Sequence, residues 1–302
     1  MAHEKDYNFS MEKQLHHLDP QLHKRFTDAV FALQYCLSKY KLIFPEYTDH
    51  SNLHSMTVID FCNRLIGDQI GRLNADELYV LLVGCYFHDT GMGISMKDYE
   101  EFSKQIDFGS YFDTHSHDDL PAIIRTFHHE YSGLFIRKYA DLFELPSPEH
   151  KQAVIQVARG HRITDLTDEK EYPLDFAVPN GNAICLPYLS ALIRLADEID
   201  VAASRNPILL YDIKSLTDET QIIENKKVRA VRWLEIREDS FILFVDPSDR
   251  VILRLLYEMA AKMQKTLDTC RAAVLGRTPY VITQQRIELF ELSPSFTLPH
   301  SP

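Results

Sequence analysis

Glycine and proline are scarce in this chain of 302 residues. Only 10 glycines and 14 prolines occur, whereas 45% of the residues are hydrophobic. So few chain-breaking residues beside so much apolar material indicate a globular, helix-rich protein. The length allows one large domain or two ordinary ones, with ample material for a buried core. No internal repeat and no low-complexity segment is visible in the sequence.

Positive charge is also in short supply. The chain has 32 Lys and Arg against 44 Asp and Glu, which gives a formal net charge of −12. This balance argues against a general nucleic-acid or anionic-membrane surface, although it leaves room for a local basic pocket. No apolar run approaches the roughly 20 residues that are needed to span a bilayer. We therefore expect neither membrane insertion nor general nucleic-acid binding.

The cysteines are few, odd in number and far apart, and most have apolar neighbours. This pattern is typical of buried free thiols in a reducing compartment, so we expect a cytoplasmic protein. The five are Cys36, Cys62, Cys85, Cys185 and Cys270.

Helical periodicity and capping residues dominate the first two thirds of the chain. Two segments break this pattern: residues 95–118, which are polar and long enough to form a lid or an insertion, and residues 163–183, which read as a loop. Six helices are expected, over residues 20–43, from Asp49 or Ser51 to Ile70, from Asn74 or Asp76 to Asp89, and over residues 121–143, 147–161 and 186–203.

The character of the sequence changes near residue 205. Segments rich in β-branched and aromatic residues predict strands at 208–213, 228–236, 241–245 and 281–289, with a helix over 248–275. The fold class is therefore mainly α, with a helical domain over 1–205. A smaller α+β domain over 206–302 is expected to serve regulation or to form a homo-oligomer.

The most informative local feature is the pair His88-Asp89. An apolar run, Leu78–Phe87, ends on these two potential metal ligands, and Gly91 and Gly93 follow at once. A helix that ends in this way can deliver both groups to the floor of a cavity. A single His-Asp pair is weak evidence, because most such pairs are solvated.

Other potential ligands accompany the pair at intervals of about one helical hairpin. His54, His128, His161 and Asp197 each lie on a predicted apolar helix, so a bundle can bring them to one interior point. Each has an ordinary alternative. His54 could lie near the surface, His161 could cap a helix C-terminus, and Asp197 could belong to a solvated face. At most one of His128 and His129 is expected to face inward, and either could form an ordinary salt bridge with Glu130. Imidazole and carboxylate ligands together suit one or two divalent ions: manganese, iron, magnesium or zinc.

The ordered set resembles the HD-domain superfamily of metal-dependent phosphohydrolases over residues 45 to 205. The strings that carry the resemblance are Asp49–Val58, Phe87-His-Asp-Thr-Gly91, Arg125–Gly133, Arg159-Gly-His161 and Leu195–Asp200. The resemblance implies an all-α bundle with a first metal held by His54, His88, Asp89 and Asp197. In binuclear members His128 and His161 complete a second metal site, whereas in mononuclear members such histidines contact the substrate phosphate.

The resemblance implies hydrolysis of a nucleotide or another small phosphate ester. A bound cation would lower the pKa of water, Asp89 would position that water and accept its proton, and His128 or His161 would stabilise the leaving oxygen. Arg125, Arg159 and Arg162 are candidate phosphate clamps, although each could equally be an ordinary surface arginine.

The chain departs from the superfamily pattern at one position beside the pair. Members that cleave cyclic dinucleotides often have a lysine where this chain has Met92, and they carry a Gly-Tyr-Pro sequence that is absent here. Methionine cannot donate a proton, so cleavage of a cyclic dinucleotide is less strongly indicated. No residue is assigned as the proton donor to the leaving group. The alternative function is an HD fold kept as a ligand-sensing or partner-binding module, with metal bound but little turnover.

Overall fold

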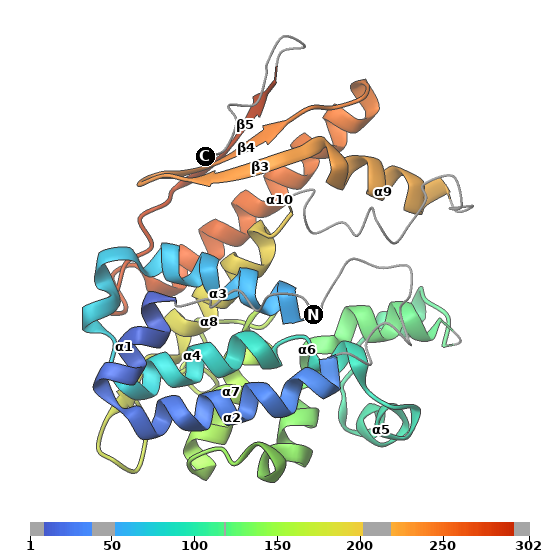
Figure 1. The fold of residues 1–302 in the computed structure, drawn as a ribbon. Helices are drawn as coiled ribbons and strands as arrows, with labels where there is room; N and C mark the ends of the chain where they lie inside the picture. The colour runs from blue at the N-terminus through green and yellow to red at the C-terminus, as the bar shows by residue number, and fades with distance from the viewer. Residues whose placement is uncertain (1–8, 38–51, 118, 202–218, 293–302) are drawn as a thin grey trace, which may run out of the picture. The chain divides into compact units, whose positions relative to one another are not determined.

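The computed structural model describes residues 9–37, 52–117, 119–201 and 219–292. Within these residues the protein is mainly α-helical, with ten α-helices, one two-stranded sheet and one three-stranded sheet (Figure 1). The chain divides into two compact units. The first comprises residues 1–197 and 270–281, and the second comprises residues 198–269 and 282–302. The predicted domain boundary at residue 205 falls outside the described residues and stays a prediction.

The first unit is a helical bundle built around one buried helix. Figure 1 shows α4 inside the bundle, and it packs against α1, α2, α3 and α7. The helices of this unit are α1 (Ser10–Leu18), α2 (Pro20–Leu37), α3 (Asn52–Ile66), α4 (Ala75–Phe87), α5 (Met96–Phe102), α6 (Leu120–Tyr139), α7 (Pro148–Gly160) and α8 (Leu186–Ile199), the last of which ends in the second unit.

The central helix α4 is buried on every side, because its residues from Asp76 to Phe87 are all buried. A helix that is apolar all round belongs in a core rather than at a surface. Its N-terminus is fixed by a capping box, in which the Asn74 side chain accepts from the Glu77 backbone N–H and the Glu77 carboxylate accepts from Asn74 N–H. The predicted start at Asn74 is therefore confirmed.

Several predicted helix ends match the structure and others differ. Ser147 caps α7 and Pro148 occupies its first turn, as predicted. The helix expected to reach Ile70 ends at Ile66 and continues as a 3-10 helix, Gly67–Arg72. The helix expected over 121–143 ends at Tyr139 and continues as a 3-10 helix, Ala140–Phe143. The helix expected to reach residue 203 ends earlier, at Ile199. Residues 38–43 and the predicted caps Asp49 and Ser51 lie outside the described residues.

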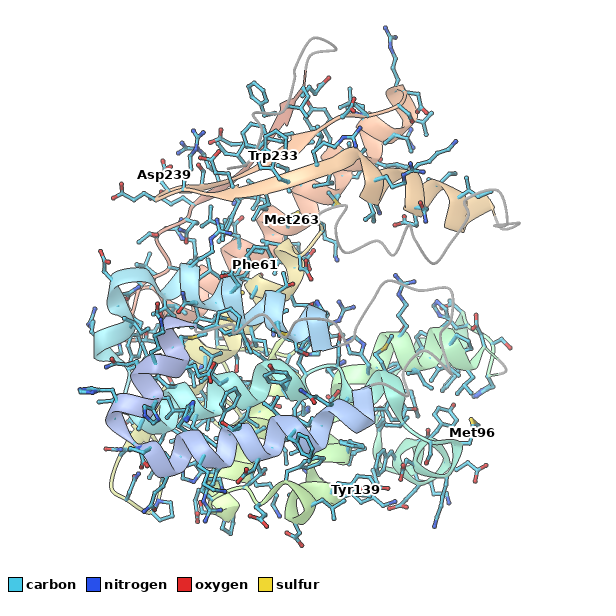
Figure 2. All side chains as sticks on the ribbon, viewed as in Figure 1. Phe61, Met96, Tyr139, Trp233, Asp239 and Met263 are labelled. Atoms are coloured by element: carbon cyan, nitrogen blue, oxygen red, sulfur yellow. The ribbon has the colours of Figure 1, made fainter. Side chains whose placement is uncertain are left out.

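The polar segment predicted at 95–118 is, over its described residues 95–117, a helical insertion that is fastened to α6. It contains α5 and two short 3-10 helices, Ser103–Gln105 and Tyr111–Asp113. The nearly buried Asp98 carboxylate accepts from Lys138 Nζ and from the Tyr139 hydroxyl, each at 2.8 Å. Figure 2 labels Tyr139 at the end of α6 and Met96 at the start of α5, where Met96 is exposed.

The predicted loop after His161 contains a small hairpin, in which β1 (Phe176–Ala177) pairs with β2 (Ala183–Ile184) in antiparallel fashion. Four of the predicted buried thiols are confirmed as free and buried: Cys62, Cys85, Cys185 and Cys270. The side chain of Cys36 lies outside the described residues. No helix among the described residues is both long enough and apolar enough to cross a bilayer.

The second unit contains a three-stranded sheet in the order β3-β4-β5, formed by β3 (Val231–Ile236), β4 (Ser240–Val245) and β5 (Arg286–Glu291). β3 and β4 form an antiparallel hairpin, and β5 runs parallel to β4. The crossover between the two parallel strands includes α10 (Arg250–Val274), which runs along one face of the sheet in Figure 1. Figure 2 labels Trp233 on β3 and Met263 on α10.

Two predicted strands were too long. Residues 228–230 belong to α9 (Glu219–Ala230), so β3 begins only at Val231. The last strand begins at Arg286 rather than at residue 281. In both cases β4 sets the limit, because Val231 pairs with its last residue and Arg286 with its first. The strand predicted at 208–213 lies outside the described residues.

A buried carboxylate at the start of α4 ties three segments of the first unit together. Asp76 Oδ1 lies 2.7 Å from His150 Nε2 on α7, and Oδ2 accepts from the amides of Asn180 and Asn182 in the hairpin. Burial by itself raises the pKa of this carboxyl, but the hydrogen bonds from His150, Asn182 and Asn180 outweigh it and hold the pKa at about 2.

The depressed pKa of Asp76 predicts a pH-dependent contribution to stability. Asp76→Asn is expected to lower the free energy of unfolding by about 2 kcal/mol at pH 7. The contribution is complete above the unfolded pKa, falls to about half at pH 3 and is nearly lost at pH 2, as the folded carboxyl takes up its proton. Urea unfolding at pH 7 and pH 3 measures it, with Asp141→Asn at an exposed carboxylate as the control. An Asp76→Asn deficit that stays constant down to pH 2 would contradict this account.

Candidate metal centre

Five helices of the first unit contribute the side chains of the candidate site. His54 lies in the first turn of α3, and His88-Asp89 follows the last residue of α4. His128 lies in the middle of α6, His161 caps the C-terminus of α7, and Asp197 lies in the last turn of α8. The sequence therefore predicted a set of residues that the structure does bring together.

The first group of ligand atoms comes from α3, α4 and α8. His54 Nε2 and His88 Nε2 are 3.2 Å apart, and they lie 3.5 and 3.4 Å from Asp89 Oδ2. Asp197 adds a second carboxylate, since its Oδ1 lies 3.3 Å from His54 Nε2 and 4.0 Å from His88 Nε2. These spacings allow one small cation to contact His54, His88 and Asp89 together.

The second group comes from α6 and α7 and uses the other oxygen of Asp89. His128 Nε2 and His161 Nε2 are 2.8 Å apart, and they lie 3.3 and 3.7 Å from Asp89 Oδ1. Asp89, His128 and His161 also lie close enough for one cation to contact all three. A single carboxylate is therefore shared by two groups, with one oxygen facing each.

The backbone selects the tautomer of three of the four histidines in the same way. The Nδ1 atoms of His88, His128 and His161 lie at hydrogen-bond distance from the carbonyl oxygens of Cys85, Arg125 and Ala158, in each case three residues earlier. A carbonyl can only accept, so each Nδ1 carries the proton and donates it. The Nε2 lone pair is then left for another partner, which is the usual arrangement behind a metal-binding imidazole.

This proton arrangement fits a cation and fits the bare protein poorly. His128 Nε2 and His161 Nε2 face each other at 2.8 Å, and the Nδ1 protons already belong to backbone carbonyls. In the neutral state two lone pairs therefore point at each other and at a carboxylate oxygen. A divalent ion among the three atoms would satisfy them together. Nitrogen and carboxylate ligands suit manganese, iron or zinc.

The surroundings of the site keep its groups in the protonation states that a cation needs. Burial lowers the pKa of His161 well below its ordinary value, and His128 and His88 lower it further, so the imidazole is neutral at pH 7. For Asp197, burial raises the pKa, but the hydrogen bond with His54 and the charges of His54 and His88 together outweigh it, so the pKa lies well below its ordinary value. Asp197 is therefore ionised.

The turn after Asp89 is held against α6 by one serine. Ser132 Oγ donates to the His88 carbonyl at 2.6 Å and accepts from Gly91 N–H at 2.8 Å. Gly91 lies in the 3-10 helix Thr90–Gly93, so close to α6 that a Cβ would stand 2.1 Å from the His128 carbonyl oxygen. No other residue type fits there without a shift of the turn away from α6. Contact at this point sets the spacing between Asp89 and His128.

The three predicted phosphate clamps lie in different environments. The Arg159 guanidinium is bound by two carboxylates, because Nη2 and Nε donate to Glu130 at 2.6 and 3.0 Å and Nη1 pairs with Glu171. Arg162, the residue after His161, is half-buried, and its buried Nε has no partner within the described part of the chain. Arg125 is exposed one turn before His128. A phosphate-binding role stays a prediction for all three.

The adjacent histidines 128 and 129 differ in what they face. His128 faces Asp89, as described above. His129 is also buried, and its Nε2 lies 3.6 Å from the Glu130 carboxylate. Burial, followed by the nearby His128 and Arg162, lowers the pKa of His129 to about 3, so it is neutral at pH 7. The sequence pattern alone could not decide between these two side chains.

Sequence reasoning missed a buried arginine that supports the His161 turn. Arg194 Nε donates to the Gly160 carbonyl at 2.7 Å, and its Nη2 donates to the Thr164 carbonyl at 2.8 Å. Arg194 precedes Asp197 by three residues, so one face of α8 carries a ligand of the first group and the support of the second. The signal was a charged residue inside the apolar run Leu186–Ala196.

The close approach at Gly91 predicts a selective loss of metal. Gly91→Ala is expected to push the turn away from α6, at a cost of about 1–3 kcal/mol in unfolding free energy. Because the turn fixes the spacing between Asp89 and His128, manganese retained after loading and desalting should fall as well. Gly71→Ala is the matched control, since no atom lies within 4 Å of a Cβ built there. Thermal unfolding and elemental analysis measure both effects, and equal results for the two variants would show that the contact does not control the site.

Comparison with known proteins agrees with this geometry. The family model described as HD-CE matches residues 44–277, which is well over half of the chain. Searches of curated proteins and of solved structures gave no match. The matched range contains every residue of the two ligand groups, and an ordered set of histidines and aspartates is what an HD-type domain presents. From this match we conclude that the chain belongs to the HD-CE family.

Proposed function

We propose that this protein is a metal-dependent phosphohydrolase that cleaves a nucleotide or another small phosphate ester. The observation that carries the proposal is the position of Asp89, whose two oxygens face different histidine groups at 3.3 to 3.7 Å. A shared carboxylate between two cation sites suits phosphoryl transfer, because the attacking and leaving oxygens both need stabilisation. The protein would therefore hold two divalent cations.

Divalent cations bound here would lower the pKa of a water molecule and neutralise charge on the phosphate. The chain's own residues would orient the reaction. His54 and His88 lie beside one oxygen of Asp89, with Asp197 next to both histidines, and His128 and His161 lie beside the other oxygen. Asp89 would position the attacking water and accept its proton, since it is the carboxylate common to both groups.

The substrate phosphate is expected on the side of the second group. Arg125 and Arg162 lie within three residues of His128 and His161 along the chain, and a guanidinium can bind two phosphate oxygens at once. Arg159 is the weaker candidate, because Glu130 and Glu171 already bind its guanidinium. In a protein with only one cation, His128 and His161 would instead contact the phosphate directly.

A second function, ligand sensing with cation bound and little turnover, is favoured by one observation. Met92, in the 3-10 turn after Asp89, is only 3% exposed and cannot donate a proton to a leaving group. A hydrolysis assay with a parallel measurement of metal content separates the two functions, because a sensor retains metal but does not turn over any substrate.

Hydrolysis of p-nitrophenyl phosphate and bis(p-nitrophenyl) phosphate with added manganese tests the proposal. The wild type is expected to turn over at least one of them, and Asp89→Ala should lower kcat/KM by at least about 100-fold because both ligand groups lose their shared oxygen donors. Asp141→Ala removes an exposed carboxylate and should keep wild-type activity. Removal of metal by a chelator should abolish turnover, and manganese should restore it.

Two results would count against phosphohydrolysis. Stoichiometric manganese without turnover of either ester or of a nucleotide panel would support the sensor. Turnover that Asp89→Ala leaves intact would mean that a different site is responsible. Elemental analysis of each sample accompanies the assay, so loss of metal is distinguished from loss of chemistry.

A further inference from the structure

We propose that an aromatic cluster in the insertion between α4 and α6 binds the base of a nucleotide substrate, and this inference rests on the proposed function. The cluster comprises the rings of Phe108, Tyr111, Phe112 and Phe127, together with the imidazoles of His115 and His117. The ligand class is a flat, heteroaromatic nucleobase attached through a sugar to the phosphate at the metal centre.

The rings of the cluster contact one another across the insertion and α6. Phe127 on α6 meets Phe108 and Tyr111 edge to face, with ring centroids 4.9 and 5.1 Å apart. Phe108 also contacts Phe112, at 5.1 Å. All four rings are half-buried, so each keeps part of its surface in contact with solvent. Rings that served only as core would be expected to lose that exposure, as the neighbouring Phe102 does.

Two of the rings already carry a flat heteroaromatic partner. Tyr111 stacks on His115 with centroids 4.1 Å apart and planes 7° apart, and Phe112 stacks on His117 at 3.8 Å and 16°. Both histidines are exposed, so each imidazole lies on the solvent side of its stack. A base would stack either on the outer face of an imidazole or directly on the Tyr111 or Phe112 ring, in the position that the imidazole now occupies. Stacking on such rings tolerates different bases, because each base has a π face.

The insertion is connected to the metal centre at both ends. Ser95 begins it six residues after Asp89, and Phe127, against which the cluster packs, is the residue before His128. Successive residues of an α-helix point about 100° apart. Phe127 therefore points about 100° away from His128 to one side of α6, and Arg125, three residues before His128, points about 60° away to the other side. A phosphate bound at His128 would thus lie one residue along α6 from the ring against which the cluster packs.

Charge around the cluster favours a base over a second phosphate. Asp107 and Asp113 are exposed beside the rings, and the structure describes no lysine or arginine between Phe108 and Leu120. Carboxylates repel phosphate, whereas they can accept hydrogen bonds from the amino and ring N–H groups of bases. The basic residues lie instead at Arg125 and Arg162, next to the ligand groups. The ligand is therefore oriented with its phosphate at the metal centre and its base on the cluster.

Binding of base-bearing and base-free phosphates by the full chain with manganese tests the proposal. The probes are the four common nucleoside 5′-monophosphates and ribose 5-phosphate, compared by calorimetric Kd, or by kcat/KM if they turn over. The best nucleotide is expected to bind at least about tenfold more tightly than ribose 5-phosphate, or to have a kcat/KM at least about tenfold higher. This factor is the base-to-no-base ratio. In Tyr111→Leu/Phe112→Leu this ratio should fall below about threefold, whereas Tyr111→Phe keeps the ring and should keep the ratio.

Tyr257→Leu is the matched control, because it removes an exposed tyrosine ring from α10 and should leave the ratio unchanged. If the double variant does not fold, as judged by thermal unfolding and metal content, the single variant Tyr111→Leu must still lower the ratio. A wild-type ratio near one, no detectable nucleotide binding, or a ratio unaffected by loss of the rings overturns the proposal.

The outcome also separates this inference from the proposed function. Turnover of p-nitrophenyl phosphate together with a nucleotide ratio near one would leave the hydrolase standing and remove the base site. A large ratio that depends on Tyr111 and Phe112, without hydrolysis of any probe, would leave the base site standing and favour the sensor.

Discussion

Both oxygens of one buried carboxylate, Asp89, face imidazole nitrogens from different helices. Oδ2 lies near His54 and His88, and Oδ1 lies near His128 and His161. Because these residues come from four helices, the position of Asp89 constrains how α3, α4, α6 and α7 pack. Burying so many polar atoms is costly unless each has a partner, and a divalent cation in each group would supply it. Metal binding and folding of this bundle are therefore expected to be coupled.

The surroundings of the site keep that carboxylate in place. Ser132 and the close approach at Gly91 hold the turn against α6, and Arg194 holds the turn that presents His161. At the opposite end of α4, Asp76 fastens α7 and the β1–β2 hairpin. The central helix is thus fixed at both ends by polar contacts inside an apolar bundle. Such contacts stabilise the fold and also fix the position of α4, and the distances between the candidate ligands depend on where α4 begins and ends.

The sequence predicted the mainly α fold and the convergence of the His and Asp side chains well, because both depend on local patterns: helix periodicity, the Asn74 and Ser147 caps, and His88-Asp89 at the end of an apolar run. The sequence did not predict features that depend on contacts between residues far apart in the chain. The β3 and β5 boundaries depend on the length of β4, which Pro247 helps to end. The partners of Arg159 come from Glu130 and Glu171, 29 and 12 residues away, and no spacing in the sequence indicates them. The aromatic cluster likewise joins an insertion to α6 by contacts that only the fold creates.

The most direct test of the account is anomalous X-ray diffraction from crystals grown with manganese, with data collected at the manganese absorption edge. We expect two anomalous peaks, one among His54, His88, Asp89 and Asp197 and the other among Asp89, His128 and His161, with one Asp89 oxygen directed at each. A single peak in the first group would leave His128 and His161 to bind phosphate directly. An absence of any peak near Asp89 in manganese-loaded protein would contradict the central claim.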